Sequence, residues 1–276
     1  MLRPTFIPRA RVAPLLLVLA LLLAACSAGP RASTVSPTAS AQPSASEAAS
    51  IEPSVAPLPS VEAVEPEEVT FTTEDGLTIA GSLLGLEDAT AGVVLGHMVN
   101  GTRTQWEVLA QQLAAAGYRV LTIDFRGYGG SDEGRTDVLD RDLAAAVAYL
   151  RERGVERVAV GGASMGAAAA ALTAQTAPVE ALIVFSSPLD FDGMRTTDDD
   201  LAAMDFPKLF VCAELDTASY GAMQDLFAAA AEPKAELWLS GGEHGTLLLA
   251  GDHAATVVRA VEDFLAGALG RPDAGA

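Results

Sequence analysis

The sequence predicts an α/β fold for residues 67–270, with about eight strands in a mostly parallel sheet and helices on both faces. Two observations support this prediction. From Ala91 onward, short apolar runs typical of buried strands alternate with segments whose apolar residues recur every three or four positions, as on one face of a helix. Glycines follow the two clearest helical segments, at Gly117 and Gly154, where helices commonly end. Such alternation indicates parallel strands covered by helices.

The chain opens with the features of an export signal. Residues 1–25 contain Arg3, Arg9 and Arg11, followed by an apolar run that is shorter than a membrane-spanning helix needs. The run ends in Leu-Ala-Ala-Cys, with the cysteine at position 26. This ending resembles the lipobox of bacterial lipoproteins, which implies removal of residues 1–25, acylation of Cys26 and export. Two or three acyl chains would anchor the protein stably on the extracytoplasmic side of a membrane.

Residues 26–66 are predicted to form a lipidated cysteine and a disordered linker. The segment after Cys26 is rich in Ala, Ser and Pro, has no aromatic residue and shows no helical or strand periodicity. Residues 271–276 are predicted to be a disordered tail. The signal carries three of the 17 basic residues and none of the 36 acidic ones, so the remainder has a net charge of −22. That charge argues against nucleic-acid and anionic-lipid binding.

The folded domain is predicted to begin with a β-hairpin. Strands at Glu67–Thr73 and Leu77–Leu84 flank Asp75-Gly76, a pair that readily adopts the positive φ angles of a tight hairpin turn. Further strands are predicted at Ala91–Gly96, Tyr118–Asp124, Val155–Gly161, Ala181–Ser186, Lys208–Ala213 and Ala235–Leu239, and helices at Thr104–Ala116, Asp137–Arg153, Met165–Thr176 and Ala254–Leu265. Only about twenty residues, 187–206, separate two of these strands, so no separate lid domain is expected.

Ser164 lies between a predicted buried strand and a predicted helix, in the sequence Gly162-Ala163-Ser164-Met165-Gly166. The pattern Gly-x-Ser-x-Gly is typical of a sharp strand-to-helix turn with an exposed serine hydroxyl. This turn brings the two glycine positions close together, so a side chain at either would collide. The helix then directs free N–H groups at the serine. The pattern alone is weak evidence, because it fixes only three positions and a chain with 25 glycines could match it by chance. The alternative is that Ser164 is an ordinary helix N-cap.

Four segments together resemble the α/β-hydrolase fold family, in particular its lidless, dienelactone-hydrolase-like serine hydrolases. They are Val93-Val94-Leu95-Gly96-His97, Asp124-Phe125-Arg126-Gly127-Tyr128-Gly129-Gly130-Ser131, the Ser164 turn and Gly242-Glu243-His244-Gly245. The family orders its nucleophile, acid and base as Ser, Asp or Glu, His. Ser164, Asp216 and His244 follow that order, each after a predicted strand, and the carboxyl ends of parallel strands share one edge. The resemblance therefore implies a catalytic triad.

In such a triad His244 takes the proton of Ser164, and the carboxylate of Asp216 holds the imidazole tautomer and its charge. Asp190 and Asp192, which follow the Ala181–Ser186 strand, are the alternative acids.

The expected oxyanion hole uses the N–H of Met165 and one from the loop after His97. Many relatives have His-Gly-x at that loop, whereas this chain has His97-Met98-Val99. By position Val99 is the preferred donor and Met98 the alternative.

The other reactive residue types receive structural interpretations. His97 is expected to brace its loop, His253 to lie at the start of the last helix, and Cys212 to be a buried core residue. The aspartates 198–200 are expected on a solvated surface, and the glycines of 127–131 lack the lysine of a phosphate loop. No metal site or cofactor is expected. The oligomeric state is not determined, and a monomer is compatible with the sequence.

Two functions of different classes follow. The first is a membrane-tethered, extracytoplasmic serine hydrolase that cleaves small or accessible acyl esters through an acyl-enzyme. The alternative is a catalytically impaired lipoprotein that keeps this fold for binding. Two departures from the family would allow it: Met98, and the acid loop Ala213-Glu214-Leu215-Asp216, where relatives often have Gly-x-x-Asp.

Overall fold

The computed structural model describes residues 49–50 and 57–272, which form a nine-stranded sheet in the order β1-β9-β8-β7-β6-β4-β5-β3-β2. The strands are β1 (Ala49–Ser50), β2 (Glu67–Thr72), β3 (Thr78–Leu84), β4 (Ala91–Gly96), β5 (Arg119–Ile123), β6 (Arg157–Ala163), β7 (Ala181–Phe185), β8 (Lys208–Ala213) and β9 (Lys234–Leu239). Strand β3 is antiparallel to its neighbours β2 and β5, and the other neighbouring pairs are parallel. The predicted mostly parallel α/β sheet is confirmed.

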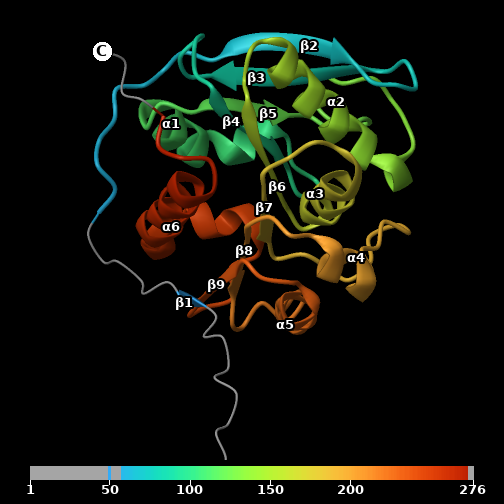
Figure 1. Cartoon of the computed structure of the whole chain (residues 1–276), viewed down its shortest axis with the longest axis vertical. Helices are drawn as coiled ribbons and strands as arrows, with labels where there is room; N and C mark the ends of the chain where they lie inside the picture. The colour runs from blue at the N-terminus through green and yellow to red at the C-terminus, as the bar shows by residue number, and fades with distance from the viewer. Residues whose placement is uncertain (1–48, 51–56, 273–276) are drawn as a thin grey trace, which may run out of the picture. The chain divides into compact units, whose positions relative to one another are not determined.

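Helices cover both faces of this sheet. They are α1 (Glu107–Ala115), α2 (Asp140–Glu152), α3 (Met165–Thr176), α4 (Asp198–Ala203), α5 (Tyr220–Ala229) and α6 (Ala254–Ala268), with short turns η1 (Arg103–Trp106), η2 (Thr136–Val138), η3 (Gly245–Leu249) and η4 (Gly251–His253). Figure 1 shows α1 and α6 on one face and α2, α3 and α5 on the other. Each face has its own apolar core, in which the side chains of the covering helices pack on the strands.

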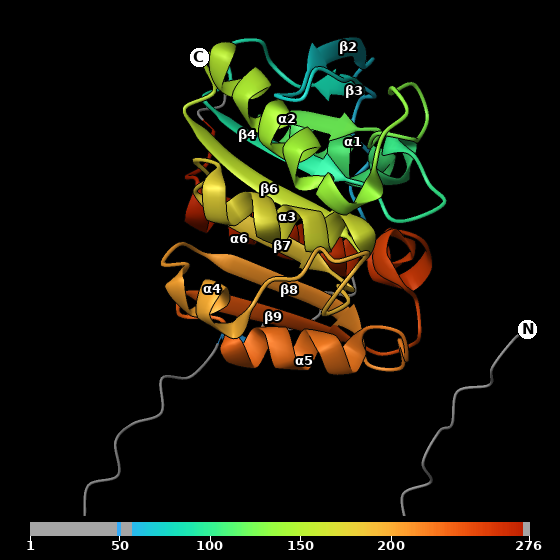
Figure 2. The ribbon, with the colours of Figure 1, turned by 90° about the vertical axis from the view of Figure 1, so that its right-hand side faces the viewer.

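Figure 2 shows the face covered by α2 to α5, with the strands running side by side behind them. The parallel strands end along one edge of the sheet, and the loops that leave β4, β6, β8 and β9 carry His97, Ser164, Asp216 and His244. Helix α3 and strands β4 and β8 have the predicted bounds.

The sequence does not predict helix α5, and it predicts the region of helix α4 only in part. Helix α5 buries only Met223 and Leu226, so its apolar stripe is too narrow to show in the sequence. Helix α4 begins with a capping box between Thr197 and Asp200. Its first turn is the run of aspartates 198–200, where the helix dipole favours negative charge. The expectation of a solvated connection here is therefore incomplete, because these residues start a helix.

The structure corrects the end of the predicted linker. Residues 57–66 lie against α1 and α6: Val64 exchanges two hydrogen bonds with the side-chain amide of Gln111, and Arg259 donates to the carbonyl of Pro57 at 2.6 Å. Leu58 and Val64 pack against the core. The composition of the long Ala/Ser/Pro segment does not indicate this docking, because only two apolar residues make the contacts.

At the other end of the domain Pro272, predicted to lie in the tail, sits beside Gly117. The signal segment, Cys26 and the first part of the linker lie outside the described residues. No helix of the described part combines the length and the apolar character that crossing a bilayer requires.

Candidate active site

Ser164 occupies a strained turn between β6 and α3. Its φ of 52° and ψ of −114° are rarely adopted by residues other than glycine, and its side chain makes no capping hydrogen bond to the helix. The interpretation of Ser164 as an ordinary N-cap is therefore wrong. A conformation of this kind costs on the order of 1–3 kcal/mol and is found mainly at functional sites.

The two glycines of the turn are required by close backbone contacts. A Cβ added to Gly162 would lie 2.1 Å from the carbonyl oxygen of Gly166, which confirms the predicted collision. A Cβ added to Gly166 would lie 2.3 Å from the carbonyl oxygen of Gly96. The start of α3 is thus pressed against the end of β4, where the loop of His97 begins.

Asp216 and His244 are hydrogen-bonded to each other. The Nδ1 atom of His244 lies 2.8 Å from Oδ2 of Asp216, whose second oxygen accepts a bond from the N–H of Ala218 at 3.2 Å. Asp216 is 3% exposed and the side chain of His244 is 29% exposed, so the carboxylate is shielded while the imidazole reaches solvent.

The two alternative acids make other contacts. Asp190 accepts from the N–H of Gly193, and Asp192 accepts from the hydroxyl of Thr136. The structure therefore brings Asp216, and neither alternative, to the imidazole.

The segments of the nucleophile and the base adjoin each other. A Cβ added to Gly245, directly after His244, would lie 3.3 Å from Cβ of Ala163 and 3.0 Å from Sδ of Met98. Ser164 is directly after Ala163 and is nearly buried. In the described part of the chain no hydrogen bond joins Ser164 Oγ to His244, so that contact belongs to the proposed mechanism below.

The loop after β4 distinguishes the two candidate oxyanion donors. The N–H of Met98 donates to Oε1 of Gln105 at 3.2 Å and is therefore already engaged. Among the described residues, the N–H groups of Val99 and Met165 make no hydrogen bond. The side-chain amide of Gln105 also packs against Gly101 of the same loop. The sequence does not indicate that Gln105 holds this loop, because it is one of several polar residues in a segment with helical periodicity.

His97 braces this loop, as the sequence indicates. The N–H of Phe125 donates to its Nε2 at 3.1 Å, so the ring proton lies on Nδ1, which donates to the carbonyl of Met98 at 2.8 Å. Burial lowers the pKa of His97 below its ordinary value of 6.5. The ring therefore ties the loop after β4 to the loop after β5. His253 precedes α6 and lies 3.8 Å from Glu243.

Two buried polar side chains, those of Ser186 and Cys212, connect the core to the carboxylate of Asp216. The hydroxyl of Ser186 donates to Sγ of Cys212, and this thiol lies 3.8 Å from Oδ2 of Asp216. Burial raises the pKa of Cys212 to about 12, so the thiol is neutral and can act only as a weak donor to the carboxylate. Cys212 is a fully buried core residue, as predicted.

The segment 124–131 is structural. Asp124 pairs with Arg103 and accepts from the N–H of Gly130, and the buried guanidinium of Arg126 pairs with Asp75 and Asp142. These contacts fix the loop after β5.

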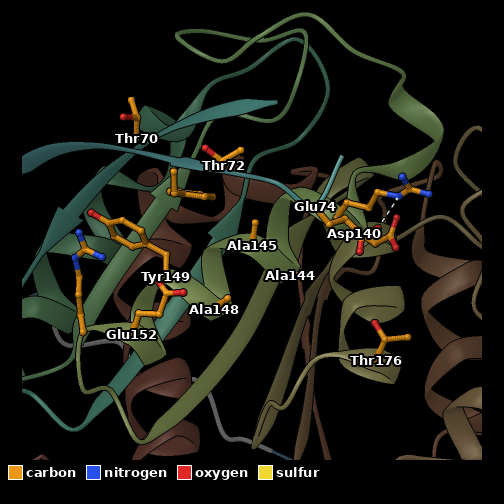
Figure 3. A pocket seen from close by; sticks show the side chains of 13 residues that line it. Thr70, Thr72, Glu74, Asp140, Ala144, Ala145, Ala148, Tyr149, Glu152 and Thr176 are labelled. Atoms are coloured by element: carbon orange, nitrogen blue, oxygen red, sulfur yellow. Dashed lines mark ion pairs between the residues drawn. The ribbon is translucent and has the colours of Figure 1, made fainter. Parts of the chain in front are cut away.

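A cavity of about 720 Å³ lies away from these groups, between edge strand β2 and helix α2 (Figure 3). Its floor consists of Ala144, Ala145 and Ala148, and Phe71 and Tyr149 lie along it with ring centroids 5.1 Å apart. It includes none of the three candidate catalytic residues and is separate from the site.

Comparisons with known proteins agree with this fold. The family model described as the alpha/beta hydrolase fold matches residues 93–253. An uncharacterized protein of Mycobacterium tuberculosis is 28% identical over 221 residues, covering 69% of this chain and 77% of that protein.

Among solved structures, the chain is similar to an esterase of Pyrococcus furiosus, with a TM-score of 0.66 and 21% identity over 75% of this chain and 92% of that one. It is also similar to a thermophilic esterase of Thermogutta terrifontis, with a TM-score of 0.63 and 18% identity over 73% of this chain and 99% of that one. At these identities the similarity shows a shared fold.

Proposed function

Because this chain belongs to the α/β-hydrolase fold family, we propose that it is a serine hydrolase that cleaves carboxylic esters. Ser164 is the nucleophile, His244 the base, and Asp216 the carboxylate that supports the base. The 2.8 Å hydrogen bond between Asp216 and His244, on a segment adjoining the strained serine, is the observation that carries the proposal. The similarity to two esterases supports the choice of esters.

The reaction takes two steps. The hydroxyl oxygen of Ser164 attacks the ester carbonyl while its proton passes to Nε2 of His244. The bond to the leaving alcohol then breaks, and the alcohol receives that proton. In the second step His244 deprotonates a water, which attacks the acyl carbonyl. The bond to the oxygen of Ser164 then breaks, His244 returns the proton to that oxygen, and the acid leaves. Throughout, the Nδ1–H of His244 donates to Asp216, which fixes the tautomer and stabilises the imidazolium.

The negative charge that develops on the carbonyl oxygen is held by the N–H groups of Met165 and Val99. Each donor of this kind lowers the barrier by about 3 kcal/mol. Val99 is preferred over Met98, because the N–H of Met98 is bonded to Gln105. Gln105 holds this loop through the N–H of Met98, so a methionine where many relatives have glycine is compatible with catalysis.

The connection between β7 and β8 contains the short helix α4 and no larger insertion. Small or accessible acyl groups are therefore the proposed substrates. The experiment measures hydrolysis of p-nitrophenyl acetate against p-nitroacetanilide, with Ser164→Ala as the control. Ester hydrolysis that vanishes in the control supports the proposal. Undiminished hydrolysis by Ser164→Ala would refute the assignment, and inertness of the wild type would favour the binding-module alternative.

The proposed location is the extracytoplasmic side of a membrane, through acylated Cys26. This proposal rests on the sequence of residues 1–26. Cys26→Ser should abolish lipid labelling and release the protein from the membrane fraction. Membrane attachment that persists in this variant would refute the lipid anchor.

A further inference from the structure

Most of the exposed large hydrophobic side chains in the described part of the chain gather at one edge of the sheet. They are Val99 (38% exposed), Leu189 (39%), Leu215 (70%) and Leu247 (53%), which lie in the loops after β4, β7, β8 and β9. The other two, Leu86 and Val108, lie on the loop after β3 and on α1. Single exposed apolar residues are ordinary, but a cluster on one edge marks a binding surface.

Three of the four side chains belong to the loops that carry the proposed catalytic groups. Val99 supplies an oxyanion donor, and Leu215 directly precedes Asp216. The N–H of Leu247 donates to the carbonyl of His244 at 3.2 Å, and that of Leu215 donates to the carbonyl of Gly241 at 2.8 Å. The cluster is therefore continuous with the site.

The fourth side chain is connected through the end of β7. Leu189 follows Ser186, whose carbonyl accepts a hydrogen bond from the hydroxyl of Ser219 at 2.8 Å. Ser219 lies three residues after Asp216, in the same loop as Leu215. This bond ties the loop of Leu189 to the loop of the acid.

Two acidic side chains lie next to the cluster in sequence. Glu214 and Glu243, both exposed, flank Leu215 and His244 in sequence. They disfavour a substrate with a carboxylate or phosphate close to its ester bond, because like charges repel. A substrate whose acyl group is uncharged and apolar avoids this repulsion and can cover the exposed leucines.

We infer that Val99, Leu189, Leu215 and Leu247 form an acyl-binding rim, and that the enzyme prefers esters of uncharged aliphatic acids. This inference rests on the proposed function. An acyl chain that leaves the carbonyl carbon at Ser164 lies on the loops around it. Each methylene of that chain removes apolar surface of the rim from water.

The test compares p-nitrophenyl acetate, butyrate and hexanoate, dissolved as monomers, with the full-length protein. The kcat/KM should rise about twofold for each added methylene, as for a chain buried on one side only. Leu215→Ser and Leu247→Ser should reduce the ratio of hexanoate to acetate by about fivefold or more. Leu86→Ser is the matched control, because Leu86 has the same 53% exposure as Leu247 but lies away from the site. Its ratio should equal that of the wild type.

A wild-type ratio near one, with acetate still hydrolysed, would overturn the rim and leave the proposed function standing. An equal fall of the ratio in Leu86→Ser would overturn it as well. A hexanoate rate that rises only where the ester aggregates would assign the leucines to a lipid surface instead. Failure to hydrolyse any of the three esters would overturn the proposed function, and the rim with it.

Discussion

Substitution of Gly166 by alanine probes the strained turn directly. A Cβ at this position would lie 2.3 Å from the carbonyl oxygen of Gly96 and 2.6 Å from that of His97. Both are backbone atoms, so no side chain can rotate aside, and α3 would have to move away from the end of β4. The movement would also displace the loop that carries the proposed oxyanion donor.

The expected cost follows from these contacts. Overpacking of a rigid site costs about 1–3 kcal/mol, and contact with fixed carbonyl groups indicates the upper end of that range. Alanine regains up to about 1 kcal/mol of helix propensity, because Gly166 is the second residue of α3. We expect a net loss of about 2 kcal/mol in the free energy of unfolding. We also expect a loss of ester hydrolysis in the fraction that remains folded.

Gly221 is the matched control, because it is the second residue of α5 and a Cβ there would meet no atom within 4 Å. Gly221→Ala should stabilise the protein by about 0.5–1 kcal/mol. Urea denaturation followed by circular dichroism measures both variants. If Gly166→Ala is as stable and as active as Gly221→Ala, the description of the turn is wrong.

The remaining predictions concern the acid, the oxyanion loop and the response to pH. Asp216→Asn should lower kcat by about 10³- to 10⁴-fold without unfolding the protein, while Asp190→Asn should leave it unchanged. Gln105→Leu should lower kcat by about tenfold with little change in KM, whereas Gln105→Glu keeps an acceptor for the N–H of Met98 and should retain more activity. Asp75→Asn should cost about 2 kcal/mol of stability at pH 7, since the buried guanidinium of Arg126 loses one of its two carboxylates.

The ion pair of Asp75 and Arg126 also determines how the stability of the folded state changes with pH. Hydrogen bonds from Arg126 hold the pKa of Asp75 below its ordinary value of 3.8. The ionised carboxylate therefore stabilises the folded state above about pH 4, and this contribution disappears as the pH falls below that value. Thermal unfolding between pH 2 and pH 7 should show a smaller acid-induced loss in Asp75→Asn than in the wild type. An identical loss in both proteins would contradict the assignment.

Contradictory results for the other variants are equally specific. Full activity of Asp216→Asn, with loss in Asp190→Asn, would move the acid to the loop after β7. A change confined to KM in Gln105→Leu would show that this side chain contacts the substrate and does not position the oxyanion loop.

The strands and helices with strong patterns could be predicted from the sequence. Met165–Thr176 and Lys208–Ala213 have their predicted bounds, because a buried helix or central strand must be apolar nearly throughout. The sequence could also predict that Asp216 and His244 lie close together. Each follows a strand of a parallel sheet, and the carboxyl ends of such strands share one edge. Local pattern and chain order were enough for these features.

Other features depend on contacts between residues distant in sequence. The hydrogen bond from Met98 to Gln105 decides which N–H is free, yet neither residue type signals it. The docking of residues 57–66 rests on the side chain of Gln111 and on two apolar residues in a polar segment. Helix α5 rests on a narrow buried face. No periodicity or composition reports such contacts.

The central claim is that Ser164 is an activated nucleophile, and covalent labelling with a fluorophosphonate tests it most directly. The wild type should gain one label, which peptide mass spectrometry should place on the peptide that contains Ser164. Ser164→Ala should gain none, and His244→Ala should be labelled far more slowly because the serine loses its base. Labelling that survives in Ser164→Ala, or a folded wild type that the probe does not modify, would contradict the account.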